Sequence, residues 1–118
     1  MKLLASELPI AIDVDETLVG KMYFTRPPHD QKYLRLDYYG TPVYVRPNLH
    51  HIAFLKACKA RGYDITVWSG NGYQWAKAVI VRLNLEPYVA YVASKPILYV
   101  DDKDAPEWMR RVYIESYE

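Results

Sequence analysis

Short apolar runs rich in β-branched residues alternate along this chain with segments in which apolar residues recur at helical spacing. Such runs are typical of buried strands, and their alternation with helices is typical of right-handed βαβ units. The sequence therefore predicts an α/β fold with a parallel sheet and helices on both of its faces. Strands are predicted at residues 8–14, 63–68, 89–92 and 97–100, helices at 47–61, 75–83 and 104–111, and an edge strand at 112–114.

The length of 118 residues supports one domain with a single core, which we expect to span residues 1–118. Residues 20–46 are the irregular part of the chain, because they show no helical period and follow directly on the first predicted strand. Within them, residues 43–45 come after a Gly-Thr-Pro turn signal and predict one half of a β-hairpin. Loops of this length in a compact domain are usually functional, so we expect residues 20–46 to contribute to the function.

Charge and cysteine content exclude several classes of protein. The chain has 15 Lys and Arg against 14 Asp and Glu, and a net charge of +1 argues against a dedicated duplex-binding protein. The single cysteine, Cys58, lies on the apolar stripe of a predicted helix and excludes an internal disulfide framework. No apolar run approaches the ~20 residues of a membrane span, and the N-terminus does not have the pattern of a signal peptide. We therefore expect a cytoplasmic protein.

Polar side chains follow the predicted strands at the points where the strands end. In a parallel sheet, ligands bind beyond the carboxyl ends of the strands, so we expect these side chains to meet at one rim. They are Asp13, Asp15 and Thr17 after the first strand, Ser69, Gly70 and Asn71 after the second, Lys95 before the fourth, and Asp101 and Asp102 after it.

These residue types point to phosphate chemistry. Clustered carboxylates repel one another unless a cation neutralises them, and oxygen ligands favour a hard cation such as Mg²⁺. Such a cation and Lys95 would also offset the repulsion between a phosphate and a carboxylate nucleophile. The Ser69 hydroxyl and the amides of Gly70 and Asn71 could hold phosphate oxygens. One Asp can attack phosphorus, while a second carboxyl can protonate the leaving oxygen and then activate water.

Each of these clusters, taken alone, is also typical of an ordinary turn, a surface lysine or a helix cap. Their order, with each cluster at a predicted strand end, is what favours a site. A receiver domain would carry its phospho-accepting Asp after the third strand, whereas here the second acid pair comes last. A metal-dependent glycosyltransferase could use Asp-x-Asp, but this chain has no room for two substrate sites.

The segments IAIDVDETL, ITVWSGN, SKP and ILYVDD resemble, in order, the four motifs of the haloacid dehalogenase (HAD) superfamily of phosphohydrolases. The resemblance covers residues 8–104 and implies a Rossmann-like core, Mg²⁺ dependence and a phospho-aspartyl intermediate. It also implies roles for single residues. Asp13 would be the nucleophile and a metal ligand, and Asp15 would be the general acid and base and would bind the metal through its carbonyl. Ser69 would bind the phosphate, and Lys95 would stabilise the phosphoryl group. Asp102 would be the chief acidic metal ligand, and Asp101 would bind the same metal directly or through water.

Two subfamilies are similar in parts. DETLVG and VYVRP, with the helix that follows, are similar to phosphatases that act on the RNA polymerase C-terminal domain. VDDKDAPEWMRRV is similar to the phosphatase part of phage polynucleotide kinase-phosphatases. In this superfamily, a segment after the first motif forms a flap or a cap over the site. Residues 20–46 occupy that place and are too short for a separate cap domain, so the resemblance implies that they form a flap. We therefore expect an open site that admits large substrates, such as a protein or a polynucleotide end.

The predicted flap carries five Lys or Arg residues, including Arg46, against two Asp, together with five tyrosines. Basic and aromatic residues together could bind a nucleotide or a nucleic-acid end, although the tyrosines could instead pack the flap on the core. The sequence thus predicts an Mg²⁺-dependent phosphomonoester hydrolase in which Thr17, Gly70, Asn71 and Arg46 contact the substrate. A phosphotransferase and a catalytically inactive HAD-like binding module are the alternatives.

Overall fold

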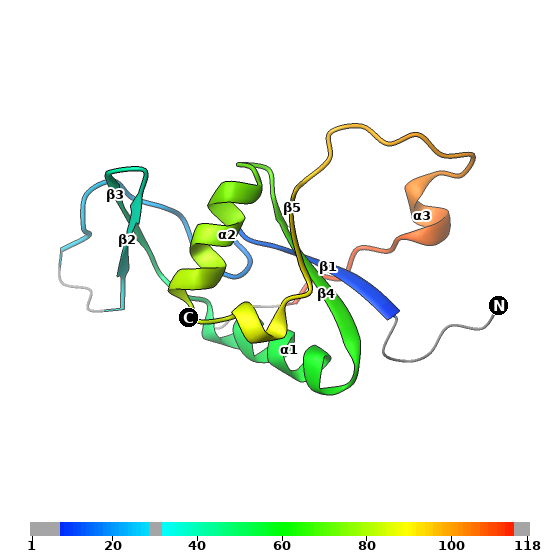
Figure 1. Cartoon of the computed structure of the whole chain (residues 1–118), viewed down its shortest axis with the longest axis horizontal. Helices are drawn as coiled ribbons and strands as arrows, with labels where there is room; N and C mark the ends of the chain where they lie inside the picture. Colours follow the sequence, from blue (N-terminus) through cyan, green and yellow to red (C-terminus); the bar gives the residue numbers. More distant parts are fainter. Residues whose placement is uncertain (1–7, 29–31, 115–118) are drawn as a thin grey trace.

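The computed structural model describes residues 8–28 and 32–114 (Figure 1), so residues 29–31 of the predicted flap lie outside the described part. Strands β1, β4 and β5 form a parallel sheet in the order β1-β4-β5, and β2 and β3 form a separate antiparallel hairpin. The predicted α/β class, a Rossmann-like parallel sheet flanked by helices, is confirmed. The elements are β1 (Leu8–Asp13), β2 (Leu34–Tyr38), β3 (Thr41–Val45), α1 (Leu49–Ala60), β4 (Tyr63–Ser69), α2 (Tyr73–Arg82), the 3-10 helix η2 (Glu86–Tyr88), β5 (Tyr91–Ser94) and α3 (Ala105–Trp108).

The core lies where α1 and α2 pack against β4, the central strand. Every second residue of β4 from Ile65 onward is buried, which is the pattern of a strand with one face on the core. Helix α1 buries Ile52, Leu55 and Cys58 of its predicted apolar stripe, whereas Leu49 at its start is exposed. Helix α2 buries Trp75 and Val79. None of the helices in the described ranges is long and apolar enough to cross a membrane.

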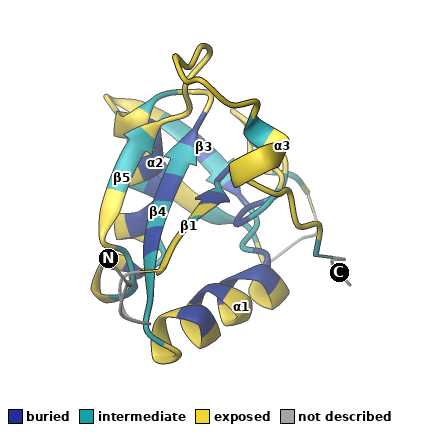
Figure 2. Cartoon of the chain, turned by 90° about the vertical axis from the view of Figure 1, so that its right-hand side faces the viewer, coloured by how far each residue is buried: buried dark blue, intermediate teal, exposed yellow. Residues whose placement is uncertain are grey.

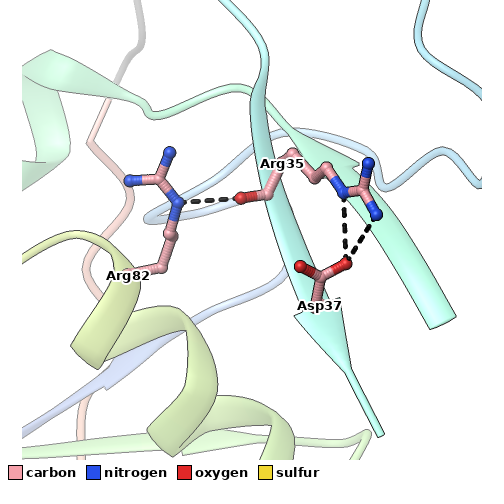
Figure 3. Close-up of polar contacts among 3 residues, drawn as sticks. All are labelled: Arg35, Asp37 and Arg82. Atoms are coloured by element: carbon pink, nitrogen blue, oxygen red, sulfur yellow. Dashed lines mark hydrogen bonds and ion pairs between the residues drawn. The ribbon is translucent and has the colours of Figure 1, made fainter. Parts of the chain in front are cut away.

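The hairpin is closed by a two-residue turn at Tyr39 and Gly40, which have φ values of 50° and 81°. Two positive φ values are required by the type I′ turn, whose twist matches that of the flanking strands, and glycine adopts them without strain. The hairpin is attached to α2 by a hydrogen bond of 2.8 Å from Arg82 Nε to the carbonyl of Arg35 (Figure 3). The Arg35 side chain pairs with Asp37 of the same strand at 3.0 Å.

Helix α1 begins later than the sequence predicts. Its N-cap is Asn48, whose side-chain oxygen accepts a hydrogen bond from the backbone N–H of His51, so Pro47 lies before the helix rather than in its first turn. The ring nitrogens of the buried His51 contact the carbonyls of Thr17 and Ile114, both at 2.6 Å. This histidine therefore links the loop after β1 to the end of the described chain.

The strand predicted at residues 97–100 is not formed. After Lys95 the chain leaves the sheet, and we call residues 97–114 the C-terminal segment (Figure 1). Figure 2 shows this segment as almost wholly exposed, and Ile97, Leu98 and Val100 are among its most exposed side chains. An apolar run becomes a strand only when a neighbouring strand supplies hydrogen bonds, and within the described residues β1 pairs with β4 alone. Likewise, residues 112–114 form no edge strand, and α3 is shorter than predicted.

Candidate active site

The site lies at the carboxyl ends of β1 and β4, where the sequence predicts it. Asp13 is the last residue of β1, and the chain then turns tightly, since the backbone N–H groups of Thr17, Leu18 and Val19 all approach the Val14 carbonyl within 3.2 Å. Val14 is completely buried between the two aspartates. Because successive side chains of an extended segment alternate in direction, burial of Val14 leaves the side chains on either side of it at the rim.

Asp15 is fixed by three hydrogen-bond donors. Its Oδ2 accepts hydrogen bonds from Ser69 Oγ at 2.7 Å and from Asn71 Nδ2 at 3.2 Å. Its Oδ1 accepts from the indole Nε1 of Trp75 at 2.9 Å. The donors come from the end of β4, the loop after it and the first turn of α2, so three parts of the chain set the orientation of one carboxylate.

Asp13 is held less firmly. Its Oδ2 accepts a hydrogen bond from Thr17 Oγ1 at 3.5 Å, which is long for such a bond. Burial raises the pKa of Asp13 above its usual value, while the ammonium group of Lys95 acts in the opposite direction. Lys95 is brought to the rim because its backbone N–H donates to the Ser69 carbonyl at 2.8 Å, directly after β5. The two aspartates therefore occupy different environments only two residues apart.

The loop after β4 is arranged around the buried hydroxyl of Ser69. This hydroxyl donates to Asp15 and accepts from the backbone N–H of Asn71 at 2.9 Å, so both of its functions are engaged. Gly70 is exposed at the tip of the loop, and a side chain there would meet nothing within 4 Å. The loop therefore presents an accessible backbone at Gly70, while Ser69 faces the carboxylate network.

Two residues that help to arrange the site were not predicted from the sequence. Trp75 opens the helix predicted at residues 75–83, and it is buried, but its indole N–H also binds Asp15. A buried tryptophan on a helix that begins at the rim is a signal for such a donor, because the indole N–H needs a partner. Ser94, at the end of β5, accepts through Oγ a hydrogen bond from the backbone N–H of Tyr73 at 2.9 Å and so fixes the start of α2.

Other predicted site residues make contacts outside this network. The backbone carbonyl of Arg46 accepts a hydrogen bond from Gly20 at 2.9 Å, which ties the end of the flap to the loop after β1. Asp101 and Asp102 are exposed in the C-terminal segment, where Asp101 Oδ1 accepts from the backbone N–H of Lys103 at 3.1 Å. Asp101 is therefore engaged in a local turn, and within the described ranges no hydrogen bond or ion pair connects either aspartate with the rim.

The donor chemistry of Asp13 and Asp15 suits Mg²⁺, which takes oxygen ligands. Across residues 8–28 and 32–114, however, no three Asp, Glu, His or Cys side chains are grouped so that they could hold a metal ion. The acidic ligand set predicted from the sequence is therefore not assembled in this arrangement of the chain.

Comparison with known proteins identifies the family. The family model described as NLI interacting factor-like phosphatase matches residues 8–110, which is most of the chain. A search of curated proteins gives no match. The matched range includes the rim, the hairpin and α3, and this agrees with the predicted resemblance to HAD phosphatases that act on the RNA polymerase C-terminal domain. The chain therefore belongs to the NLI interacting factor-like phosphatase family and is a phosphatase.

Proposed function

We propose that this phosphatase hydrolyses phosphomonoesters through a phospho-aspartyl intermediate on Asp13, with Asp15 as general acid and base. The observation that carries the proposal is the contrast between the two carboxylates. Asp15 is oriented by three donors, as a group that moves a proton must be. Asp13 has one long side-chain hydrogen bond, from Thr17, and one from the Val14 backbone, so fewer contacts have to be broken before its oxygen attacks a phosphorus atom.

The proposed reaction has two steps. In the first, an Asp13 oxygen forms a bond to phosphorus, the bond from phosphorus to the ester oxygen breaks, and the leaving oxygen takes a proton from Asp15. In the second, Asp15 accepts a proton from water, and the water oxygen attacks phosphorus. The bond to Asp13 then breaks, which releases phosphate and restores both carboxyl groups. Transfer to an alcohol instead of water would make the chain a phosphotransferase.

We propose that the phosphate oxygens are bound by the groups that are accessible at the rim. This assignment is supported by the exposed backbone of Gly70 and by the electrostatic interaction of the Lys95 ammonium group with Asp13. Ser69 reaches the phosphate only when its hydrogen bond to Asp15 opens, because both functions of its hydroxyl are engaged. In this assignment Thr17 and Asn71 position the two carboxylates and border the substrate.

We further propose Mg²⁺ as the cofactor, with Asp13 and the Asp15 carbonyl as ligands at the rim. When bound, this cation supplies positive charge against the repulsion between phosphate and carboxylate. Asp101 and Asp102 can join these ligands only if the C-terminal segment moves to the edge of β1 that has no partner among the described strands. A titration with Mg²⁺ alone tests this: hydrogen exchange of the amides at residues 97–102 should slow as the ion binds.

The activity is tested by phosphate release from p-nitrophenyl phosphate, measured with Mg²⁺ and with EDTA. The substitution Asp13→Asn should lower turnover at least about 10³-fold, because loss of a nucleophile removes the covalent route. Asp64→Asn is the matched control, since it makes the same chemical change near the start of β4, at the opposite end of the sheet. Equal turnover by wild type and Asp13→Asn would rule out the proposed intermediate. A folded wild type that binds phosphate esters without turnover would support the binding module.

A further inference from the structure

A groove of about 730 Å³ lies between the hairpin and the exposed face of α2. The hydrogen bond between Arg82 and the Arg35 carbonyl crosses from one wall to the other (Figure 3). From Tyr73 to Arg82 the α2 wall extends about 13 Å at 1.5 Å per residue. The groove is therefore long enough for a few units of an extended polymer.

The groove is positively charged. Arg35 is paired with Asp37, so these two lining residues cancel. Lys77 and Arg82 also line the groove, and neither forms an ion pair within the described parts of the chain. Two uncompensated cations at one groove suit an anionic partner.

Exposed aromatic rings stand beside these cations. Tyr39 at the hairpin turn is 75% exposed and Tyr73 at the start of α2 is 51% exposed. The ring of Tyr38 meets that of Tyr39 at 4.8 Å, edge to face. Tyrosine rings along a cationic groove are the features that bind single-stranded nucleic acid, because bases stack on the rings while phosphates meet the cations. A phosphopeptide would use the charges but would leave most of the ring surface without a partner.

The groove reaches the loop that follows β4. Tyr73 lines the groove and opens α2 directly after this loop. Asn71 of the same loop donates a hydrogen bond to Asp15. A strand lying along α2 therefore has one end beside the loop that contacts Asp15.

We propose that this groove binds single-stranded nucleic acid and presents a phosphorylated end of the strand to the rim. The proposal rests on the proposed phosphomonoesterase function, because it names the substrate class of that site. Binding along the groove does not need the reaction, however, so a strand without a terminal phosphate is also a ligand.

The test is fluorescence anisotropy with a labelled, unphosphorylated ten-residue oligothymidylate over a range of salt concentrations. For wild type, the logarithm of the association constant should fall linearly with the logarithm of the salt concentration. Lys77→Ala should reduce that slope by about 0.7, the value for one phosphate contact on a single strand. Lys59→Ala removes the same charge from the exposed face of α1 and should leave the slope as in wild type.

A second variant tests the aromatic contribution. Tyr39→Asn removes the ring but tolerates the positive φ of this position, so the hairpin turn is preserved. Loss of one stacked base should weaken binding about tenfold. The proposal is overturned if Lys77→Ala and Lys59→Ala behave alike, if Tyr39→Asn binds as wild type does, or if a phosphoserine peptide of equal length and charge binds while the oligothymidylate does not. None of these outcomes depends on turnover, so they are separate from failure of the Asp13 experiment.

Discussion

The two acid pairs of this chain lie in opposite surroundings. Asp13 ends strand β1 and Asp15 follows it closely, and the residues that support them, among them Val14, Ser69 and Trp75, are buried. Asp101 and Asp102 lie in the C-terminal segment, whose apolar residues face solvent. Packed neighbours hold a functional group in one geometry, whereas a side chain on an exposed segment is fixed only when the segment binds something. The first pair is thus placed by the fold itself, and the second depends on what the segment binds.

The strongest test of this comparison uses matched isoleucines. Ile65 in β4 is completely buried, so Ile65→Ala should destabilise the fold by about 2–5 kcal/mol through lost burial and a cavity. Ile97 in the C-terminal segment is fully exposed, so Ile97→Ala should change the free energy of unfolding by less than about 0.5 kcal/mol. Urea unfolding followed by circular dichroism gives both values. A loss at Ile97 as large as that at Ile65 would show that the segment is packed in solution.

Two tryptophans give a smaller contrast. Trp75 is 2% exposed and binds Asp15, so Trp75→Phe should reduce stability by about 1–3 kcal/mol, because the carboxylate loses a buried donor. Trp108 in α3 is 51% exposed and meets Tyr99 edge to face, so Trp108→Phe should lie within about 0.5 kcal/mol of wild type. The same urea unfolding measurement checks both. Equal effects would mean that the indole bond to Asp15 adds nothing to stability.

The sequence predicts the rim well because the rim depends on local patterns. The runs that become β1 and β4 are bounded by turn residues, and the polar residues after them meet because the strands are parallel. The first helix is predicted to end at residue 61, which is its C-cap, and Gly62 directly after it has a φ of 89°, which is common after the last residue of a helix. The amphipathic stripes of α1 and α2 likewise identify most of the residues that these helices bury, although Leu49 of the α1 stripe is exposed.

The rest depends on contacts that a single sequence does not reveal. Residues 97–100 have the composition of a strand, but pairing needs a partner edge, and composition does not supply one. The role of Trp75 depends on its distance from Asp15, which follows from how α2 packs. The extent of the domain, residues 1–118, and a cytoplasmic location remain predictions, as do the roles assigned to the site residues.

The smallest effect that we expect is the contribution of Asp13 to the pH dependence of stability. Because burial raises its pKa in the folded protein above the usual 3.8, the folded state binds this proton more tightly than the unfolded chain does. Stability gained from the bound proton is present below pH 3.8 and is lost as the pH rises through the folded pKa. Wild type should therefore lose stability relative to Asp13→Asn between acid and neutral pH. Urea midpoints of both proteins across this range measure the difference, and the opposite trend would mean that attraction to Lys95 outweighs burial.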